Sequence, residues 1–325
     1  MHFILVGVFM FKLAIVGATG LVGQSVMKVL HQQNLLNQFS PVLIASKKSA
    51  GKRIVFNGIE YGVVALDENC LKMKFDFVIF SAGAGISKQW AEKFVDSGAV
   101  VIDNTSAFRM CEKTPLVVPE INGDTILPSH KLISNPNCST IQLAVVLDRL
   151  LKCCQIEKVV VSTYQSVSGA GRRALLDLIN DTKNYFKNGI KNKIIPAIGE
   201  IDSNGFCEEE NKIMFELSKI LNQNISVCAT AVRVPVPYCH GESVYVEFEN
   251  DVDLNKLKQA LNCEYIDVCD DLVCVENCVC QHKTYVCRLR LVSKNEALMF
   301  VVADNLFRGA AFNAVEIMKL AAKLK

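Results

Sequence analysis

FKLAIVGATGLVG, residues 11–23, joins an apolar run to a glycine-rich turn. FKLAIV has the length of a buried strand, and the following VGQSVMKVLHQQ repeats its apolar side chains with a helical period. Gly17, Gly20 and Gly23 lie in the turn between them. Such glycines let the backbone approach a pyrophosphate at the helix N-terminus, although they can also serve tight packing alone. The stretch therefore predicts a strand, turn and helix unit typical of dinucleotide-binding domains.

Three more apolar runs, at residues 40–46, 75–83 and 98–106, end in small or polar residues. Strands with such ends that alternate with helices are typical of a doubly wound parallel sheet, whose ligand lies at the carboxyl ends of the strands. We predict that residues 10–137 form this Rossmann-type α/β domain. The last stretch of the chain is again amphipathic, and residues 306–325 are expected to complete the domain as a C-terminal helix.

The pattern changes after about residue 138. Apolar or alternating segments follow one another with few helical stretches between them, at residues 158–168, 225–236, 242–249 and 284–292. This pattern favours a mostly antiparallel sheet with helices on one face. We therefore predict a second, α+β domain over residues 138–305.

Size and composition agree with two domains. The chain has 325 residues, 50% of them hydrophobic and 21% charged, with a net charge of +2. A balanced charge without a basic stripe argues against nucleic acid as a partner, and no segment has the roughly 20 apolar residues of a membrane helix. The first ten residues, MHFILVGVFM, lack the basic start of a secretory signal, which predicts a cytoplasmic protein. Met10 as the true start and an extra apolar segment on the sheet edge stay open as alternatives.

Fourteen cysteines in a cytoplasmic chain are expected to be reduced thiols. Six of them cluster near the C-terminus, but the cluster contains no C-x-x-C pair, so we predict no metal site. Cys274, Cys278 and Cys280 share the parity of a strand, which predicts that they are small buried hydrophobic residues. The six are Cys263, Cys269, Cys274, Cys278, Cys280 and Cys287.

The segment after the second apolar run reads ASKKSAGK, residues 45–52, and contains no acidic residue. An acid near this strand end usually binds the ribose 2′-hydroxyl of NAD. Ser46, Lys48 and Ser49 suit a 2′-phosphate instead, which predicts NADP as the cofactor. A solvated surface loop is the alternative interpretation.

SNPNCST, residues 134–140, places Cys138 directly before the apolar helical pattern TIQLAVVLDRLL. Unpaired amide donors at a helix N-terminus stabilise a thiolate, so we expect a lowered pKa and a nucleophilic Cys138. No other cysteine of the sequence shows this setting.

Three further polar residues lie near strand ends. Gln165 precedes a flexible Ser-Gly-Ala-Gly turn, and RVPVPYCHGE supplies Arg233 and His240 on a segment whose prolines exclude a helix. Histidine is the natural acid/base partner of a catalytic thiol. Taken singly, a histidine such as His240 more often has a structural role, so its candidacy depends on the other residues.

With these residues considered together, the chain from about residue 11 to its end resembles the aspartate-semialdehyde dehydrogenase family. The matching segments include KLAIVGATGLVG (12–23), SNPNCSTIQL (134–143), STYQSVSGAG (162–171), RVPVPYCHGES (233–243) and ADNLFRGAA (303–311). The resemblance implies NADP-dependent, reversible conversion of 4-phospho-L-aspartate to L-aspartate 4-semialdehyde, on the route to lysine, diaminopimelate, threonine and methionine. It further implies a thioester on Cys138, with His240 as acid/base and Gln165 orienting the intermediate.

The resemblance also implies ligand roles for other residues. Arg109 and Lys212 look like phosphate ligands, and Arg233 looks like the ligand of the substrate carboxylate. Glu209 would meet the substrate ammonium, although Glu208, Glu210 or a merely solvated helix face remain alternatives. Asn137 joins the substrate-binding set. The expected cofactor-binding residues are Gly17, Thr19, Gly20, Leu21, Val22, Gly23, Ser46, Lys48, Ser49, Ser81, Ala82, Gly83, Ser168, Gly169 and Asn305.

The sequence departs from the family pattern at two positions. Lys48 stands where an arginine is frequent, which weakens the argument for NADP over NAD, and Cys239 stands where glycine or alanine is usual. The family implies a homodimer or tetramer, with the interface on the second domain. Two rival functions remain: a nucleotide-binding sensor without catalysis, and a reductase for another acyl phosphate.

Overall fold

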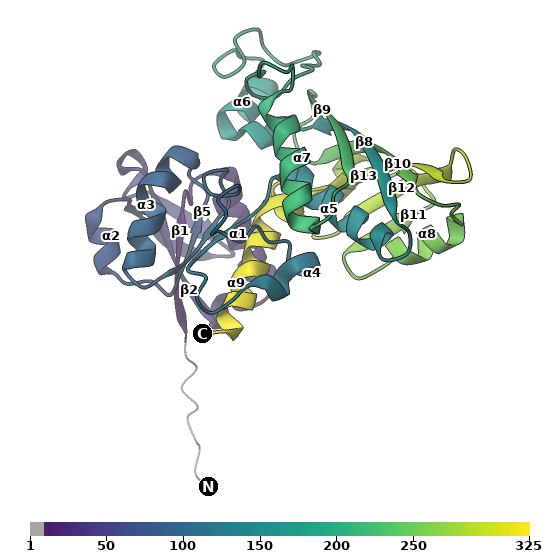
Figure 1. Ribbon diagram of the computed structural model, residues 1–325. Coiled ribbons are helices and arrows are strands. Elements are labelled where there is room, and N and C mark those ends of the chain that lie inside the picture. The colour runs from purple at the N-terminus through teal and green to yellow at the C-terminus, as the bar shows by residue number, and fades with distance from the viewer. Residues whose placement is uncertain (1–9) are drawn as a thin grey trace.

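The computed structural model describes residues 10–325, which form two lobes, each built on its own sheet (Figure 1). Residues 1–9 lie outside the described range, and so do the two alternatives for the segment that precedes Met10. Within residues 10–325, no helix is both long enough and apolar enough to cross a lipid bilayer.

The first sheet has seven strands in the order β3-β4-β2-β1-β5-β6-β7. All neighbouring strands are parallel except the edge hairpin of β3 and β4. In this order, the strands are Arg53–Phe56, Ile59–Ala65, Phe39–Ala45, Phe11–Val16, Phe77–Phe80, Val100–Asp103 and Leu132–Ser134.

Helices cover both faces of this sheet. Successive side chains of a strand point to opposite faces, so a wholly apolar strand makes both faces apolar and both must be buried. Leu13 and Ile15 of β1 share a core with the first helix α1 and the last helix α9, whereas Ala14 and Val16 share one with α2 and α3. The expected doubly wound α/β domain is thus confirmed. The helices of this lobe are α1 (Leu21–Gln32), α2 (Glu68–Lys72), α3 (Ala84–Asp96), α4 (Pro119–Asn122) and α9 (Asn313–Lys323), the last preceded by a π-helical turn, Phe307–Phe312.

The second sheet has six strands in the order β11-β12-β13-β10-β8-β9. The three central pairs are antiparallel and the two outer pairs are parallel, which confirms a mostly antiparallel sheet. In this order, the strands are Ile266–Cys269, Thr284–Leu291, Glu296–Ala303, His240–Phe248, Ile156–Gln165 and Ser226–Arg233.

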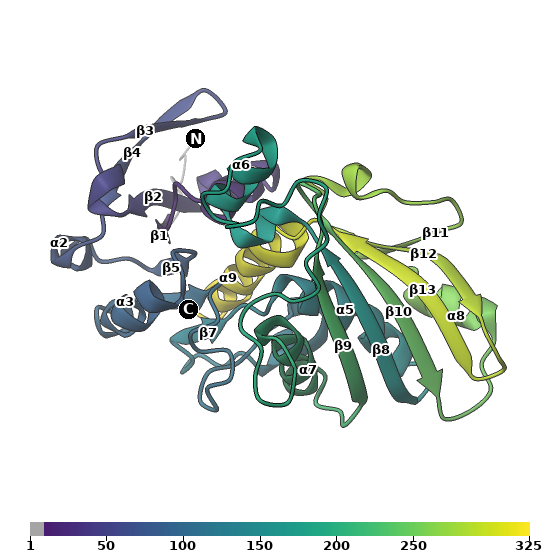
Figure 2. The ribbon, with the colours of Figure 1, turned by 90° about the horizontal axis from the view of Figure 1, so that it is seen from above.

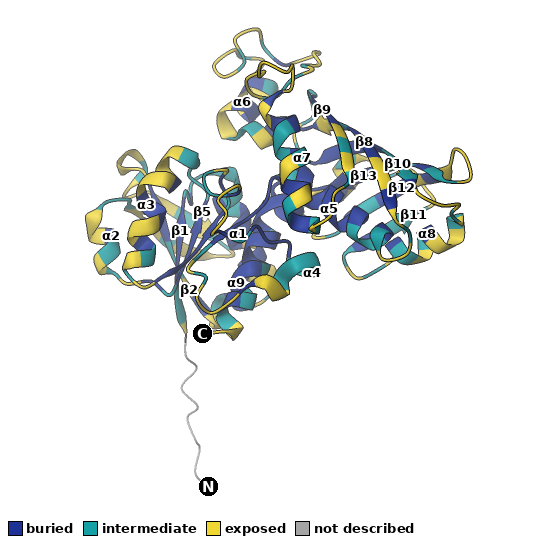
Figure 3. Cartoon of the chain, in the orientation of Figure 1, coloured by how far each residue is buried: buried dark blue, intermediate teal, exposed yellow. Residues whose placement is uncertain are grey.

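Helices α5 (Cys138–Leu151), α7 (Glu208–Leu221) and α8 (Leu254–Leu261) form one core with this sheet (Figure 2). The short α6 (Arg172–Asn180) lies beyond the end of the sheet. Helix α5 is almost wholly buried, whereas α7 presents an exposed outer stripe (Figure 3). The nucleophile candidate Cys138 is therefore the first residue of a helix that the core holds on most sides.

All fourteen cysteines are free thiols. Among residues 10–325, no group of three His, Cys, Asp or Glu side chains is arranged to hold a metal ion. The strand parity predicted for Cys274, Cys278 and Cys280 is wrong, because Val275–Cys278 forms a 3-10 turn. Only Cys278 of the three is buried, and Cys274 is exposed.

Candidate active site

A cavity of about 540 Å³ opens between the two lobes. The first lobe contributes the turn at Gly20 and the loop that carries Arg109. The second lobe contributes Cys138, the end of β8 and residues of α7. The parallel strands of the first sheet thus direct their carboxyl ends toward the candidate nucleophile, as expected for an α/β ligand site.

Sheet register brings three of the predicted site residues into one row. Gln165 ends β8, and it pairs with Arg233 at the end of β9 on one side and with His240 at the start of β10 on the other. Their exposures are 1%, 6% and 0%, respectively. Three segments that are far apart in the sequence therefore present their polar side chains at the same edge of the second sheet.

Cys138 begins α5, and Asn137 is the capping residue of this helix. The Asn137 Oδ1 accepts hydrogen bonds from the amides of Ser139 at 2.9 Å and Thr140 at 3.3 Å. We expected the helix to open at Ser139 and Thr140 with unpaired amides. Those two amides are instead satisfied by the cap, as is common at helix starts.

His240 faces the sulfur of Cys138, with its Nε2 at 3.3 Å from Sγ. On the other side of the ring, the backbone amide of Ser166 donates to Nδ1 at 3.0 Å. Because an amide can only donate, Nδ1 is the acceptor, and a neutral ring carries its proton on Nε2. The structure thus directs an N–H group of His240 at the sulfur.

The expected lowering of the Cys138 pKa is wrong for the free protein. Burial, followed by the negative charge of Glu209, raises the pKa of the Cys138 thiol to about 12, and Arg109 and Arg233 oppose this only in part. Cys138 keeps some surface open to the cavity, but protein encloses it closely enough for desolvation to dominate. Burial, followed by Arg233, also lowers the pKa of His240 to about 3. Thiol and imidazole are therefore both neutral before substrate binds.

The three glutamates at the start of α7 differ in their surroundings. Glu209 is 5% exposed, lines the cavity, and accepts from the side-chain amides of Asn137 at 2.7 Å and Gln165 at 3.2 Å. Glu210 instead accepts from backbone amides of the neighbouring segments, and the Glu208 side chain is 57% exposed. Glu209 thus has the site geometry expected of the ammonium ligand.

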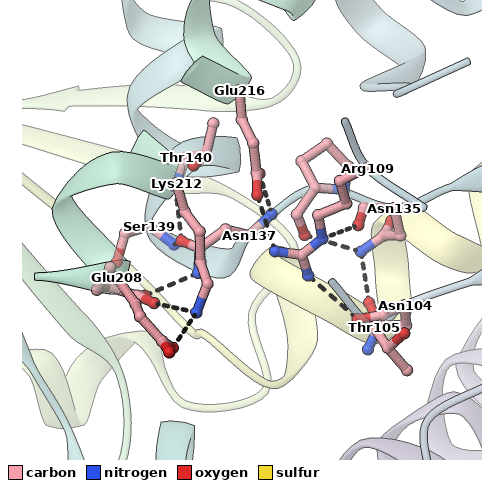
Figure 4. Close-up of polar contacts among 12 residues, drawn as sticks. Asn104, Thr105, Arg109, Asn135, Asn137, Ser139, Thr140, Glu208, Lys212 and Glu216 are labelled. Carbon is pink, nitrogen blue, oxygen red and sulfur yellow. Dashed lines mark hydrogen bonds and ion pairs between the residues drawn. The ribbon is translucent and has the colours of Figure 1, made fainter. Parts of the chain in front are cut away.

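Charged side chains surround the rest of the cavity. Lys212 lies 3.3 Å from Glu209. Arg109, 8% exposed, donates from Nη1 to Glu216 at 3.0 Å and from Nε to the carbonyl of Asn135 at 2.9 Å (Figure 4). Arg233 donates from Nη1 to the carbonyl of Ser166 at 2.6 Å. With Lys212, Arg109 and Arg233, and with the exposed Arg172 and Glu208 also in its lining, the cavity combines several cations with one buried acid, Glu209. This set suits a doubly anionic ligand that also carries an ammonium group.

The glycine turn is tightly packed at Gly17 and Gly23 and leaves the helix start without a side-chain cap at Gly20. A Cβ on Gly17, whose φ is +90°, would lie 2.7 Å from the backbone of Ser81, and one on Gly23 would lie 2.5 Å from the carbonyl oxygen of Gly17. Gly20 caps α1 without a side chain, which leaves the first amides of the helix free of a side-chain cap beside the cavity. These residues fit a bound dinucleotide.

The other predicted cofactor residues fall into two sets. Most line the main cavity or an adjoining one of about 300 Å³, whereas Gly23 serves packing, and Lys48 and Ser49 lie in a 3-10 turn that follows β2. Asn305 is 2% exposed and accepts from the amide of Cys239 at 3.0 Å. The lining set is Gly17, Thr19, Gly20, Leu21, Val22, Ser46, Ser81, Ala82, Gly83, Ser168, Gly169 and Asn305.

Sequence reasoning missed several supporting residues. The backbone of Ser166 anchors both His240 and Arg233. A Cβ on Gly309 would lie 2.8 Å from the Cβ of Cys138, so the π-helical turn forms the wall behind the nucleophile. Glu216 was also missed, although its position two helical turns after Glu209 was a usable signal because such residues share a helix face.

Two family models match the chain. The semialdehyde dehydrogenase NAD binding domain matches residues 12–128, and the semialdehyde dehydrogenase dimerisation domain matches residues 147–308. Aspartate-semialdehyde dehydrogenase from Aquifex aeolicus is 40% identical, over 96% of this chain and 98% of that protein. The enzyme of the same name from Bacillus subtilis is 38% identical, over 96% and 97%.

The chain belongs to the aspartate-semialdehyde dehydrogenase family. Solved structures agree with this assignment. Aspartate-semialdehyde dehydrogenase II from Vibrio cholerae superposes with a TM-score of 0.91 at 36% identity, covering 97% of this chain and 99% of that one. The same enzyme complexed with ASA gives a TM-score of 0.90 at 35% identity, covering 97% and 98%. The expected family is confirmed, and with it an oxidoreductase whose first domain binds a nicotinamide dinucleotide.

Proposed function

We propose that the protein interconverts 4-phospho-L-aspartate and L-aspartate 4-semialdehyde with NADP(H) and phosphate, through a thioester on Cys138. The observation that carries the proposal is the pair of Cys138 and His240, 3.3 Å apart, beside a cavity that also holds Arg109, Arg233 and Glu209. A nucleotide-binding sensor without catalysis would have no need of this pair. The product would supply lysine, diaminopimelate, threonine and methionine biosynthesis.

In the biosynthetic direction, the sulfur of Cys138 forms a bond to the acyl carbon of the substrate. The bond from that carbon to the phosphate oxygen breaks, phosphate leaves, and a thioester remains. NADPH, when bound, supplies the hydride that reduces the thioester to the aldehyde level. The bond between the sulfur and that carbon then breaks, the aldehyde leaves, and the sulfur of Cys138 takes up a proton to become a thiol again.

We assign substrate recognition to the charges of the cavity. Arg233 would hold the α-carboxylate, Glu209 the ammonium, and Arg109 with Lys212 the phosphate, because each pairs opposite charges. Asn137 supports this set through its bond to Glu209. The substrate ammonium would also offset the charge of Glu209, which after burial is the second cause of the raised pKa of Cys138, whereas the phosphate and carboxylate would offset Arg109 and Arg233, which lower it.

His240 and Gln165 are proposed to serve the intermediate. The Nε2–H of His240 is directed at the sulfur and can donate to an oxygen that gains negative charge on the adjacent carbon, which is the position an acid/base group needs. Gln165 lies beside it in the sheet and would orient the carbonyl.

We further propose NADP rather than NAD, a homodimer or tetramer, a cytoplasmic location and a domain boundary at residues 137 and 138, with residues 306–325 in the first domain. The lysines of the turn Lys47–Ser49, at the end of β2, support NADP. The free state of all the cysteines supports a reducing compartment.

The test is NADPH and NADH oxidation with 4-phospho-L-aspartate and with N-acetyl-glutamyl phosphate as substrates. We expect turnover of the first substrate with preference for NADPH, and none after Cys138→Ser, a variant that still binds NADPH. Turnover of N-acetyl-glutamyl phosphate alone would refute the substrate assignment. Full activity in Cys138→Ser would refute the thioester.

A further inference from the structure

Glu216 is a buried acid that the proposed substrate and cofactor contacts do not include. It is 1% exposed and lies in the middle of α7, two helical turns after Glu209. Residues two turns apart share one helix face, and here both acids contact Asn137, the residue that precedes the nucleophile. Two side chains of α7 thus hydrogen-bond to Asn137 at the start of α5.

The carboxylate of Glu216 bridges two donors. Its Oε1 accepts from Nη1 of Arg109 at 3.0 Å, and its Oε2 accepts from the backbone amide of Asn137 at 2.6 Å (Figure 4). Burial raises the pKa of Glu216, and Arg109 and the Asn137 amide oppose that rise. Because both oxygens accept N–H bonds, the bridging form is the carboxylate.

The two groups that Glu216 joins act on opposite sides of the proposed reaction: Arg109 lies where the phosphate would bind, and Asn137 precedes the nucleophile Cys138. Arg109 is a fixed point, because Nε and Nη2 donate to the carbonyls of Asn135 at 2.9 Å and Asn104 at 3.2 Å. Its remaining N–H groups are left for an anion in the cavity that it lines. Asn137 is bonded through the chain to Cys138, so its amide sets where the sulfur lies.

We propose that Glu216 is a positioning residue that fixes the distance between the anion-binding Arg109 and the sulfur of Cys138. The inference rests on the proposed function, in which the sulfur attacks a carbon bonded to the phosphate that Arg109 binds. Nucleophilic attack requires the reacting atoms at about 3 to 3.5 Å, and a small displacement of one partner slows it steeply. Glu216 itself touches neither substrate nor phosphate.

Glu216→Gln tests the bridge. Whichever way the carboxamide turns, its NH₂ group faces an N–H donor, so one of the two contacts is lost together with the charge. We expect kcat in the phosphate-dependent oxidation of L-aspartate 4-semialdehyde to fall about 10- to 100-fold, the loss typical of a hydrogen bond to a charged group. The KM for inorganic phosphate should change less than about threefold, because Arg109 keeps its carbonyl anchors.

Glu210→Gln is the matched control. Glu210 belongs to the same helix, is 7% exposed, and accepts from the backbone amides of Cys207 and Ala231 at 2.8 and 2.9 Å. Its replacement should lower thermal stability and leave kcat per folded molecule unchanged. If Glu210→Gln lowered kcat as much as Glu216→Gln, the effect would be general loosening of α7 and the inference would fail.

Two further results would overturn the inference: an unchanged kcat in Glu216→Gln, or a raised phosphate KM with kcat unchanged. If Glu216→Gln does not fold, Glu216→Asp keeps the charge but is too short to bridge both donors, and the same fall in kcat is expected. Alkylation of Cys138 by iodoacetamide needs no substrate. It should be faster in Glu216→Gln than in wild type or Glu210→Gln, so it tests the hold on Cys138 even if wild type proves inactive on the proposed substrate.

Discussion

The reaction proposed for Cys138 and the environment of its thiol oppose each other. Its sulfur must be anionic to attack an acyl carbon, yet burial and Glu209 raise the pKa of the free thiol to about 12. The same glutamate has the position of the ammonium ligand. A substrate ammonium would remove this repulsion, whereas the substrate's phosphate and carboxylate would offset Arg109 and Arg233, which lower the pKa. The raised pKa of the free thiol would protect the free enzyme from oxidation and alkylation.

Glu209→Gln should make the free thiol more reactive. Burial is the largest cause of the raised pKa of Cys138 and the charge of Glu209 is the second, so removing this charge lets the thiolate form at lower pH. A pKa lower by one gives about a tenfold rise in thiolate at a given pH. The iodoacetamide rate at Cys138, followed from pH 6 to 10 by peptide mass spectrometry, should begin to rise at a lower pH than in wild type. Glu208→Gln, at a side chain that is 57% exposed, is the control. Identical pH profiles in all three proteins would contradict the role of Glu209.

At this scale, sequence reasoning identified the reacting residues but not their charge state. Cys138 could be selected because a helix pattern follows it, which is local information. Its pKa depends on burial and on Glu209 of a distant helix, which no local pattern contains. The structure also shows a second cysteine at a helix start, since Cys207 caps α7, so the setting of Cys138 is not unique among the cysteines.

Among the elements, the π-helical turn Phe307–Phe312 has a position that suggests a function of its own. π-helical turns are rare and are frequent at functional sites. This one carries Gly309 against the first residue of α5, where an added Cβ would lie 2.8 Å from the Cβ of Cys138. Close packing against this turn therefore fixes the position of Cys138, the first residue of α5.

Gly309→Ala should lower kcat by at least about tenfold, because the new methyl group must push Cys138 out of line with its substrate. Overpacking of this kind also costs about 1 to 3 kcal/mol of stability. Gly85→Ala is the control, since its Cβ in α3 would meet no atom within 4 Å. Steady-state rates and thermal unfolding would be measured on both variants. Wild-type kcat in Gly309→Ala would show that close packing of Gly309 against Cys138 is not needed for catalysis.

Local patterns predicted most elements of both sheets, because a buried parallel strand is an apolar run and an amphipathic helix has a clear period. The hairpin of β3 and β4, Arg53–Phe56 and Ile59–Ala65, was missed because most of its side chains are exposed or only partly buried, so neither strand is a continuous apolar run. The row of Gln165, Arg233 and His240 was also beyond local reasoning. It depends on the register of three strands that pair over long sequence distances.

For the molecule as a whole, we propose that the second sheet forms the dimer interface with the face that points away from α5. Residues 147–308 match the dimerisation domain of the family, and Val160 and Tyr164, on alternate positions of β8, are 38% and 41% exposed. Val160→Asp should lower the dimer fraction in sedimentation velocity by burying a charge. Val55→Asp, at a 63% exposed site of the other lobe, should leave it unchanged. A Val160→Asp protein that stays fully dimeric would exclude this face.

The stability of the whole molecule should depend on pH through Glu242. This side chain of β10 is 0% exposed, and burial raises its pKa well above the ordinary value, with the side chain of Gln142 opposing that rise only in part. A raised folded-state pKa means that its contribution to stability is fully present below the unfolded pKa of about 4.3 and is lost as pH rises toward the folded value.

Glu242→Gln should remove that loss. The variant should gain stability over wild type as pH rises from 5.5 to 8, by up to about 1.4 kcal/mol for each unit of pH in that range. Urea unfolding at the two pH values measures this difference. Glu247→Gln, further along the same strand, serves for comparison. A variant that is equally destabilised at both pH values would show that Glu242 is held as a carboxylate.

The position of α9 has a consequence for synthesis on the ribosome. Val315, Ile317 and Met318 of this last helix lie in the same core as Leu13 and Ile15 of the first strand. The nucleotide-binding lobe therefore cannot complete its core until α9 has emerged. The second lobe, whose strands all come from residues 156–303, can close earlier. A nascent chain that stops before α9 would thus keep its thiol lobe and lack a finished cofactor lobe, so synthesis of α9 is required for an active enzyme.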